Sequence, residues 1–175
     1  MQHRPKTAGF KFFSKILLPV FSIYYNPRVI VEHPIPMQGA TVICSNHKHV
    51  MDQCMAALST KRGINYMAKA EYFQGPFAWF FKATGCICVN RNGHDEEAKS
   101  EANAVLSSGG ALGIFPEGTR SKDFKPSKAK SGIGVIAREA KANILPVSIY
   151  NCDEMKKGTK LTIRFGELIP YEKLG

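Results

Sequence analysis

The sequence predicts an α/β domain in which a mixed, largely parallel central sheet is flanked by helices, and two observations support this fold class. Short β-rich segments alternate with helical segments from residue 28 onward, which is the pattern of an α/β sheet with helices packed on it. A chain of 175 residues that is 44% hydrophobic suits one domain with a substantial core. The expected strands cover residues 29–32, 40–45, 64–68, 86–89, 111–115, 144–149 and 161–165.

The helices expected between these strands are placed by the residues at their ends. The helix Asp52–Lys61 begins with an aspartate, which is favourable there through capping and the helix dipole. A short helix follows Gly75-Pro76, and the helix Asp95–Ser107 is closed by Gly109-Gly110. A last helix is expected over Ile133–Ala142.

Residues 1–27 precede this alternation and form a distinct predicted segment. Apolar residues recur there at three- and four-residue steps, which is the spacing of a helix face, and lysines flank them. This pattern is typical of a helix that lies in a membrane interface; a first helix packed on the domain is the structural alternative. We therefore expect an amphipathic N-terminal segment over 1–27, which either packs on the domain or associates with a membrane, and the main domain over 28–175. The apolar residues are Phe10, Phe13, Leu17, Phe21 and Tyr24, and the lysines are Lys6, Lys11 and Lys15.

No stretch of the sequence is predicted to span a membrane. The most apolar one, Ile16–Tyr25, has only ten residues, whereas a spanning helix needs about 20. The basic start is not followed by a small-residue cleavage site, so no signal peptide is expected. A second aromatic patch, Phe73–Phe81, suits a membrane interface, an apolar pocket or plain core packing.

The net charge of +10 limits the classes of partner. A basic surface attracts nucleic acid, anionic lipid head groups or phosphorylated substrates, and it also serves solubility alone. The lysines and arginines are scattered, and no helix-turn-helix, zinc finger or RNP-type strand is present, so we expect no nucleic-acid partner. The five cysteines have neither disulfide nor zinc spacing, which indicates reduced thiols in a cytosolic compartment.

The segment Ser45–Asp52 follows a predicted strand and opens a helix. His47 and Asp52 are five residues apart, which is about 140° of rotation in a regular helix, so they meet only if His47 lies in the turn. Asp52 then either caps the helix or holds the His47 imidazole as a base. The pattern His47-x-His49 is similar to a zinc motif, but Asp52 is one residue too far along and the adjacent histidine is missing; we expect no metal.

Polar residues follow two other predicted strands. In Phe115–Ser121, Gly118 permits a close backbone approach, while Thr119 and Arg120 offer groups suited to phosphate. Ligand sites in open α/β sheets gather at such strand ends; a polar turn with Glu117 paired to Arg120 is the alternative. A second arginine, Arg91, ends the segment 85–91 and suits a joint phosphate clamp or a solvated surface.

Together these segments resemble the PlsC family of glycerolipid acyltransferases. His47–Asp52 is similar to its H-x4-D block, and Phe115–Ser121 is similar to its F-P-E-G-T-R-S block. The segment Gly85–Arg91 resembles the second block, except that Asn90 replaces the usual acid. The likeness runs in order from about Val29 to Ile169, and members of the family commonly continue beyond this point. Two further likenesses are Leu145–Ile149, a strand carrying a proline, and Lys128–Gly132.

The resemblance implies a reaction and the residues that perform it. His47 would act as general base on the sn-2 hydroxyl of lysophosphatidic acid, and Asp52 would orient and charge-stabilise it. Arg91, Arg120 and Lys130 would hold the phosphate, while Glu117, Gly118 and Thr119 would shape the acceptor site. Glycerol-3-phosphate or another lysophospholipid is the alternative acceptor, and a non-catalytic membrane-binding protein is the rival class.

The resemblance also implies the partners of the reaction. The acyl donor is expected to be a thioester of acyl-carrier protein or coenzyme A, and no cofactor is expected. Since substrate and product both carry acyl chains, the enzyme would dock on the anionic cytoplasmic face of the cell membrane as a peripheral or monotopic protein. Neither the oligomeric state nor the preferred chain length follows from the sequence.

Overall fold

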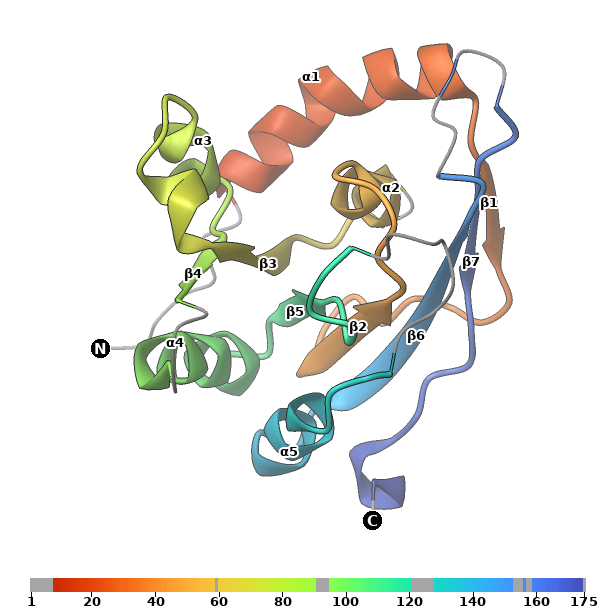
Figure 1. Cartoon of the computed structure of the whole chain (residues 1–175). Helices are drawn as coiled ribbons and strands as arrows, with labels where there is room; N and C mark the ends of the chain where they lie inside the picture. The colour runs from red at the N-terminus through yellow and green to blue at the C-terminus, as the bar shows by residue number, and fades with distance from the viewer. Residues whose placement is uncertain are drawn as a thin grey trace.

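The central sheet contains seven strands within the part of the chain that this computed structural model describes, namely residues 8–58, 60–90, 95–120, 128–152, 156 and 159–174. The strand order is β1-β7-β6-β2-β5-β3-β4, and all neighbouring pairs are parallel except β6 and β7 (Figure 1). The predicted mixed, largely parallel sheet is therefore confirmed. The strands are β1 (Arg28–Val31), β2 (Thr41–Ser45), β3 (Ile64–Lys69), β4 (Ile87–Val89), β5 (Ala111–Ile114), β6 (Asn143–Tyr150) and β7 (Thr162–Phe165).

Helices cover both faces of this sheet (Figure 1). One face carries α1 (Ala8–Tyr25) and α2 (Asp52–Leu58), and the other carries α4 (Glu96–Ser107) and α5 (Gly132–Glu139). The short α3 (Ala78–Ala83) lies beside the start of α1. The predicted helices and strands all occur, with ends that differ by up to three residues. Two single-turn 3-10 helices that the sequence pattern does not predict follow β3 and Pro170, at Ala70–Phe73 and Tyr171–Lys173.

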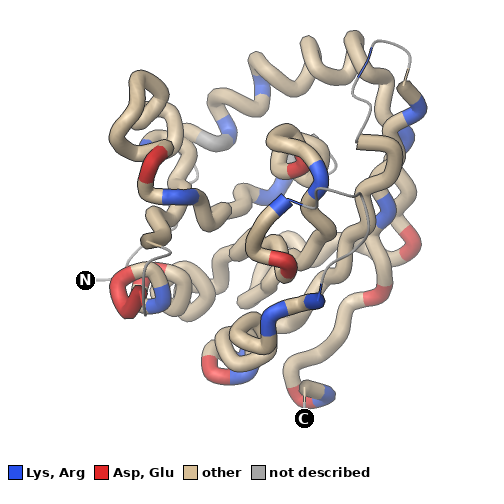
Figure 2. The backbone as a smooth tube through the Cα atoms, in the orientation of Figure 1, with Lys and Arg blue, Asp and Glu red and all other residues tan. Residues whose placement is uncertain are grey.

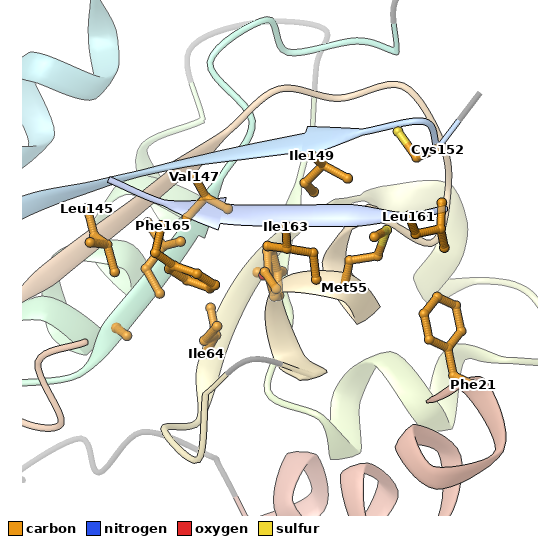
Figure 3. Packing of buried hydrophobic residues seen from close by; sticks show 14 residues of the cluster. Phe21, Met55, Ile64, Leu145, Val147, Ile149, Cys152, Leu161, Ile163 and Phe165 are labelled. Carbon is orange, nitrogen blue, oxygen red and sulfur yellow. The ribbon is translucent and has the colours of Figure 1, made fainter. Parts of the chain in front are cut away.

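The core on the α1–α2 face joins elements that are far apart in the sequence. Phe21 of α1 and Met55 of α2 pack with apolar side chains of β6 and β7, such as Ile163 (Figure 3). Met55 and Ile163 have no exposed surface, and Phe21 is 7% exposed. Burying a side chain of this size stabilises the fold by about 1.5–3 kcal/mol. The helix α1 is therefore part of the folded domain as well as its first segment.

The close contact between α1 and α3 depends on a glycine. A Cβ atom added to Gly9 would lie 1.8 Å from the carbonyl oxygen of Ala83, so only a residue without a side chain lets α1 approach the end of α3 this closely. The ring of Phe13 then packs against Trp79 and Phe80, with centroid distances of 5.7 and 5.0 Å.

The predicted apolar stripe of the first helix is divided between the domain and the surface. Phe13 and Phe21 face the domain, whereas Leu17 and Tyr24 are about half exposed. The predicted members Lys6 and the Phe10 side chain lie outside the described residues. A second stripe, also at helix spacing, points outward and is not part of the sequence prediction. It consists of Phe12, Ile16, Val20 and Ile23, which are 60%, 53%, 65% and 84% exposed.

The amino-terminal ends of the central strands are tied together by Arg62, which is only 6% exposed. Its Nη1 donates to the carbonyl of Pro36 at 2.7 Å and to the hydroxyl of Thr41 at 3.1 Å. Its Nη2 donates to the carbonyls of Gly39 and Gly109. One buried guanidinium thus links the loops that lead into β2, β3 and β5. Its N–H groups donate to backbone carbonyl oxygens and to one hydroxyl oxygen.

Candidate active site

The candidate site lies at the carboxyl ends of two neighbouring strands. β2 and β5 are parallel and in register, with Cys44 opposite Ile114, so the segments that follow them emerge side by side. The first segment carries His47 and leads into α2, and the second carries Glu117 and Arg120. Adjacent carboxyl ends of a parallel sheet are where ligands bind in folds of this class.

The turn between β2 and α2 brings His47 and Asp52 into contact. His47 Nδ1 lies 3.0 Å from Asp52 Oδ2, and the backbone N–H groups of Lys48 and His49 donate to the same oxygen at 2.7 and 2.8 Å. A carboxylate only accepts hydrogen bonds, so Nδ1 is the donor in the first contact. The proton therefore resides on Nδ1, and Nε2 is left as the basic atom of the ring.

Asp52 is fully buried at the base of this turn. Its second oxygen, Oδ1, has no hydrogen-bond partner among the described residues. Burial, reinforced by the negative charge of Asp52, raises the pKa of the neighbouring Cys152 thiol to about 12. That thiol consequently stays neutral at physiological pH, so it adds no negative charge beside Asp52.

Asn46 holds the turn on the adjacent strand. Its side-chain nitrogen donates to the carbonyl of Ile149 at 2.9 Å, and its side-chain oxygen accepts from the Ile149 N–H at 2.8 Å. The amide thus pairs with β6 as one more strand residue would. Asn46 was not among the predicted site residues, since asparagine side chains at turns are expected to bond to nearby backbone and this bond spans 103 residues.

Glu117 connects the two strand ends. Its carboxylate accepts a hydrogen bond from the backbone N–H of His47 at 3.1 Å, across 70 residues of sequence, and its side chain is buried. The turn that presents Glu117 is closed by a 2.9 Å bond from Gly118 N–H to the Phe115 carbonyl. The position of the His47 backbone therefore depends on the β5 turn as well as on its own loop.

Lys130 crosses over Gly118. The φ angle of Gly118 is +71°, a conformation that glycine adopts readily. A Cβ added to Gly118 would lie 3.1–3.2 Å from Lys130 Cε and Nζ. The Lys130 N–H also donates to the Pro116 carbonyl at 3.0 Å, so the ammonium group is carried to the same turn as Thr119 and Arg120.

A single cleft of about 990 Å³ contains most of the residues predicted for the site. His47, Gly118, Thr119, Arg120 and Lys130 all line it. The structure thus places His47 and these predicted acceptor residues in the lining of one cleft, with Glu117 and Asp52 buried next to the His47 turn. The predicted residue Arg91 lies outside the described residues.

The cleft is lined by basic side chains near the turns and by apolar side chains between α1, β3 and α3. The basic side chains outnumber the acidic ones: Asp95 is the one acidic residue among the described residues of the lining. The cleft therefore attracts anionic groups. Figure 2 shows basic positions on several elements rather than along one of them. The cleft extends between α1, β3 and α3 along apolar side chains, which include Leu17, Leu18, Met67, Phe80 and Phe81. The lining basic residues are Lys48, Lys69, Lys99, Arg120 and Lys130.

Two cysteines, Cys54 and Cys86, also line the cleft. Burial raises the pKa of Cys54 to about 11 and raises that of Cys86. Because the thiolate is the reactive form of cysteine, these groups are poor nucleophiles near neutral pH. His47 is thus the better placed group for proton chemistry in this cleft. Among the described residues, no group of three or more His, Cys, Asp or Glu side chains is arranged to hold a metal ion.

Sequence comparison gives a family match and several relatives. The model of the family described as Acyltransferase matches residues 26–150. A 1-acyl-sn-glycerol-3-phosphate acyltransferase of Borreliella burgdorferi is 32% identical over 120 residues, which is 67% of this chain and 48% of that protein. One of Bacillus subtilis is 27% identical over 163 residues, covering 90% of this chain and 81% of that protein. The match to a 1-acyl-sn-glycerol-3-phosphate acyltransferase of Chlamydomonas reinhardtii covers 45% of that protein. The chain therefore spans about half the length of the Borreliella and Chlamydomonas relatives.

A solved structure shares the fold. The crystal structure of the 1-acyl-sn-glycerophosphate (LPA) acyltransferase PlsC from Thermotoga maritima superposes with a TM-score of 0.72 at 24% sequence identity. The match covers 94% of this chain and 78% of the other. The arrangement of the sheet and its helices is therefore one that a known protein also adopts.

Proposed function

The chain belongs to the acyltransferase family, and from this premise we propose that it moves a fatty acyl group from an acyl thioester to the sn-2 hydroxyl of 1-acyl-sn-glycerol 3-phosphate, giving phosphatidic acid. The observation that carries the proposal is the 3.0 Å contact between His47 Nδ1 and Asp52 Oδ2 at the wall of a cleft that is basic in one part and apolar in another. An acceptor that brings its own hydroxyl requires a base from the enzyme and no serine.

In the proposed reaction, His47 Nε2 accepts the acceptor's hydroxyl proton while the hydroxyl oxygen attacks the thioester carbonyl carbon. Asp52 stabilises the imidazolium that forms and keeps the ring oriented. Collapse of the tetrahedral intermediate breaks the carbon–sulfur bond, and the imidazolium returns its proton to the departing thiolate. A cysteine-linked intermediate is disfavoured because burial keeps Cys54 and Cys86 protonated.

The acceptor's phosphate is assigned to the turn after β5. Arg120 and Lys130 supply positive charge within the cleft that His47 lines, and Thr119 supplies a hydroxyl. Glu117 shapes the site through its bond to the His47 backbone, and Gly118 leaves space for the Lys130 side chain. Arg91 is proposed as a further phosphate ligand on its sequence block alone.

The acyl chains are assigned to the apolar part of the cleft between α1, β3 and α3. The donor is proposed to be a thioester of acyl-carrier protein or coenzyme A. Both are anionic and suit the basic lining, which includes Lys48 and Lys69.

We also propose that residues 1–27 dock the protein on the anionic cytoplasmic face of the cell membrane. No helix in the described part of the chain is long and apolar enough to cross a bilayer. The proposal is supported by the outward stripe of α1, by its neighbours Lys11 and Lys15, and by the exposed rings of Phe77 and Trp79. Apolar insertion combined with basic charge is the usual basis of interfacial binding.

The reaction is tested with purified protein, labelled acyl-carrier protein and coenzyme A thioesters, and a panel of acceptors separated by thin-layer chromatography. The panel contains lysophosphatidic acid, glycerol-3-phosphate and other lysophospholipids. We expect phosphatidic acid from lysophosphatidic acid at the highest rate. A protein that acylates other acceptors but not lysophosphatidic acid would reject the proposed substrate, and one that acylates none would reject the activity.

Membrane docking is tested separately by sedimentation with vesicles. We expect binding to vesicles rich in phosphatidylglycerol and weaker binding to neutral phosphatidylcholine vesicles. The double variant Ile16→Glu/Val20→Glu should lose binding, because both side chains are more than half exposed on the outward stripe. Its matched control is Lys99→Glu on α4, which changes charge without touching α1. Equal binding of the double variant and the wild type would reject this part of the proposal.

A further inference from the structure

Three nearly parallel rings cross three adjacent strands beside the candidate site. The His47 imidazole stacks on the Phe115 ring with a centroid distance of 4.0 Å and an interplanar angle of 17°. Phe115 in turn stacks with Tyr66 at 5.9 Å and 18°. The rings belong to β3 and to the residues that follow β2 and β5, and these strands are neighbours in the order β2-β5-β3.

A glycine in β5 makes room for this stack. Tyr66 of β3 lies opposite Gly113 in the strand register. A Cβ added to Gly113 would lie 2.4 Å from Tyr66 Cε1, so any side chain there would displace the tyrosine ring. A glycine inside a strand commonly marks such a close approach. The absence of a side chain at Gly113 allows Tyr66, which is 7% exposed, to support Phe115 from behind.

The imidazole is consequently held in two ways. Asp52 fixes the Nδ1 atom through its hydrogen bond, and Phe115 lies flat against one face of the ring. When His47 accepts a proton, its charge develops over the face of Phe115, where the negative electrostatic potential of an aromatic ring attracts cations. This attraction is absent while the imidazole is neutral, so it favours the transition state over the ground state.

We propose that Phe115 is a positioning residue that orients the His47 imidazole and stabilises its protonated form through its π face, with Tyr66 as its support. The inference rests on the proposed role of His47 as general base. Phe115 acts on the histidine and through it on the reaction. The electronic character of the ring therefore matters, in addition to its shape.

The test replaces Phe115 by phenylalanine analogues with one, two and three ring fluorines, introduced by codon suppression. Fluorine withdraws charge from the π face while the shape of the ring is nearly kept, so the variants should fold. We expect kcat to fall stepwise, reaching about a tenfold loss with three fluorines, which is the scale of a partly buried cation–π contact. The apparent KM for the acceptor should stay within about twofold of wild type.

The matched control places the same analogues at Phe165, which is fully buried in β7 and belongs to the core on the α1–α2 face. We expect kcat to be constant across that series, since only packing is altered there. A flat kcat across the Phe115 series would overturn the proposal. A fall in kcat of the same size in the Phe165 series, or an effect at Phe115 on KM alone, would overturn it as well.

The stack itself is measured independently of activity by NMR of protein labelled at histidine. The imidazole signals of His47, identified by their loss in His47→Ala, are expected to shift in Phe115→Leu because the ring current of Phe115 is removed. The variant Phe115→Tyr should restore them, together with kcat. Unshifted signals in Phe115→Leu would reject the stacking even if transferase activity is present, and a shift in a protein that is inactive on every acceptor would reject the proposed function while leaving the stack in place.

Discussion

The two ends of strands β2 and β5 use buried polar groups in different ways. At the amino ends, the Arg62 guanidinium donates to carbonyl and hydroxyl oxygens of the loops that enter the sheet. At the carboxyl ends, the second carboxylate oxygen of Asp52, Oδ1, is buried without a hydrogen-bond partner among the described residues. Buried polar groups without partners cost stability and are expected where they serve another purpose. We infer that one end of the sheet is built mainly for stability and the other mainly for chemistry.

The largest expected effect tests the chemical role of the carboxyl end. His47→Ala removes the general base of the proposed reaction, so we expect kcat to fall by at least about 100-fold, the usual scale for a general base. The thermal unfolding temperature should fall by only a few degrees, because the buried Asp52 carboxylate loses its contact with His47 but keeps two backbone donors. The checks are steady-state kinetics and calorimetry on the same preparation. Retained activity would remove His47 from the mechanism.

The next largest expected effect is on stability and tests the role of Arg62 at the amino end. Arg62→Met leaves several buried carbonyl and hydroxyl acceptors without a donor, so we expect the free energy of unfolding to fall by about 3 kcal/mol. Urea denaturation measures this loss, and Arg62→Lys, which keeps the charge with fewer donors, should lose less. The kcat of the folded fraction should be close to wild type at low temperature. A change in kcat without loss of stability would contradict the division between the two ends.

Arg120→Ala tests whether the charges of the carboxyl end bind substrate. Arg120 is exposed and lines the cleft, so its removal should leave the free energy of unfolding nearly unchanged. We expect the apparent KM for lysophosphatidic acid to rise about tenfold, the equivalent of about 1.4 kcal/mol. The same kinetics measured against the thioester at saturating acceptor provide the control. An effect on the donor alone would contradict the assignment of Arg120 to the acceptor's phosphate.

The smallest expected effect concerns Asn46, which has a structural role at the carboxyl end of the sheet. Asn46→Ala removes two hydrogen bonds to Ile149, and we expect a loss of about 1 kcal/mol in stability. Because Asn46 holds the turn that carries His47, kcat should fall severalfold as well. Asn46→Asp, which retains only the acceptor, is the comparison. A stability loss with unchanged kcat would show that the turn is held by its other contacts.

The sequence predicted the parts of the site that lie close together in the chain. The spacing of His47 and Asp52 excluded a helical pairing and required the turn that the structure contains. The order of the β-rich segments and the polar residues behind them likewise predicted which strand ends carry the site. Local geometry of this kind follows from a few residues and from the dihedral angles they adopt.

The remaining parts depend on contacts that a single sequence does not encode locally. Glu117 bonds to the His47 backbone across 70 residues, and no spacing rule connects the two. The stack of Tyr66 and Phe115 on His47 requires the strand order, although Gly113 inside a strand was a signal of close approach. The outward stripe of α1 was missed because that helix is apolar on both sides, so the apolar period alone does not tell which side faces the domain.

The bond between Glu117 and the His47 backbone has a consequence for how the protein matures. While the chain is being synthesised, residues 46–52 emerge well before residue 117, and the carboxylate that anchors the histidine is still missing. Ile149, which pairs with Asn46, emerges later still. Contacts of such long sequence separation form late in folding. A nascent or partly folded chain is therefore expected to be catalytically silent, and catalysis should begin only when the whole sheet has closed around the turn.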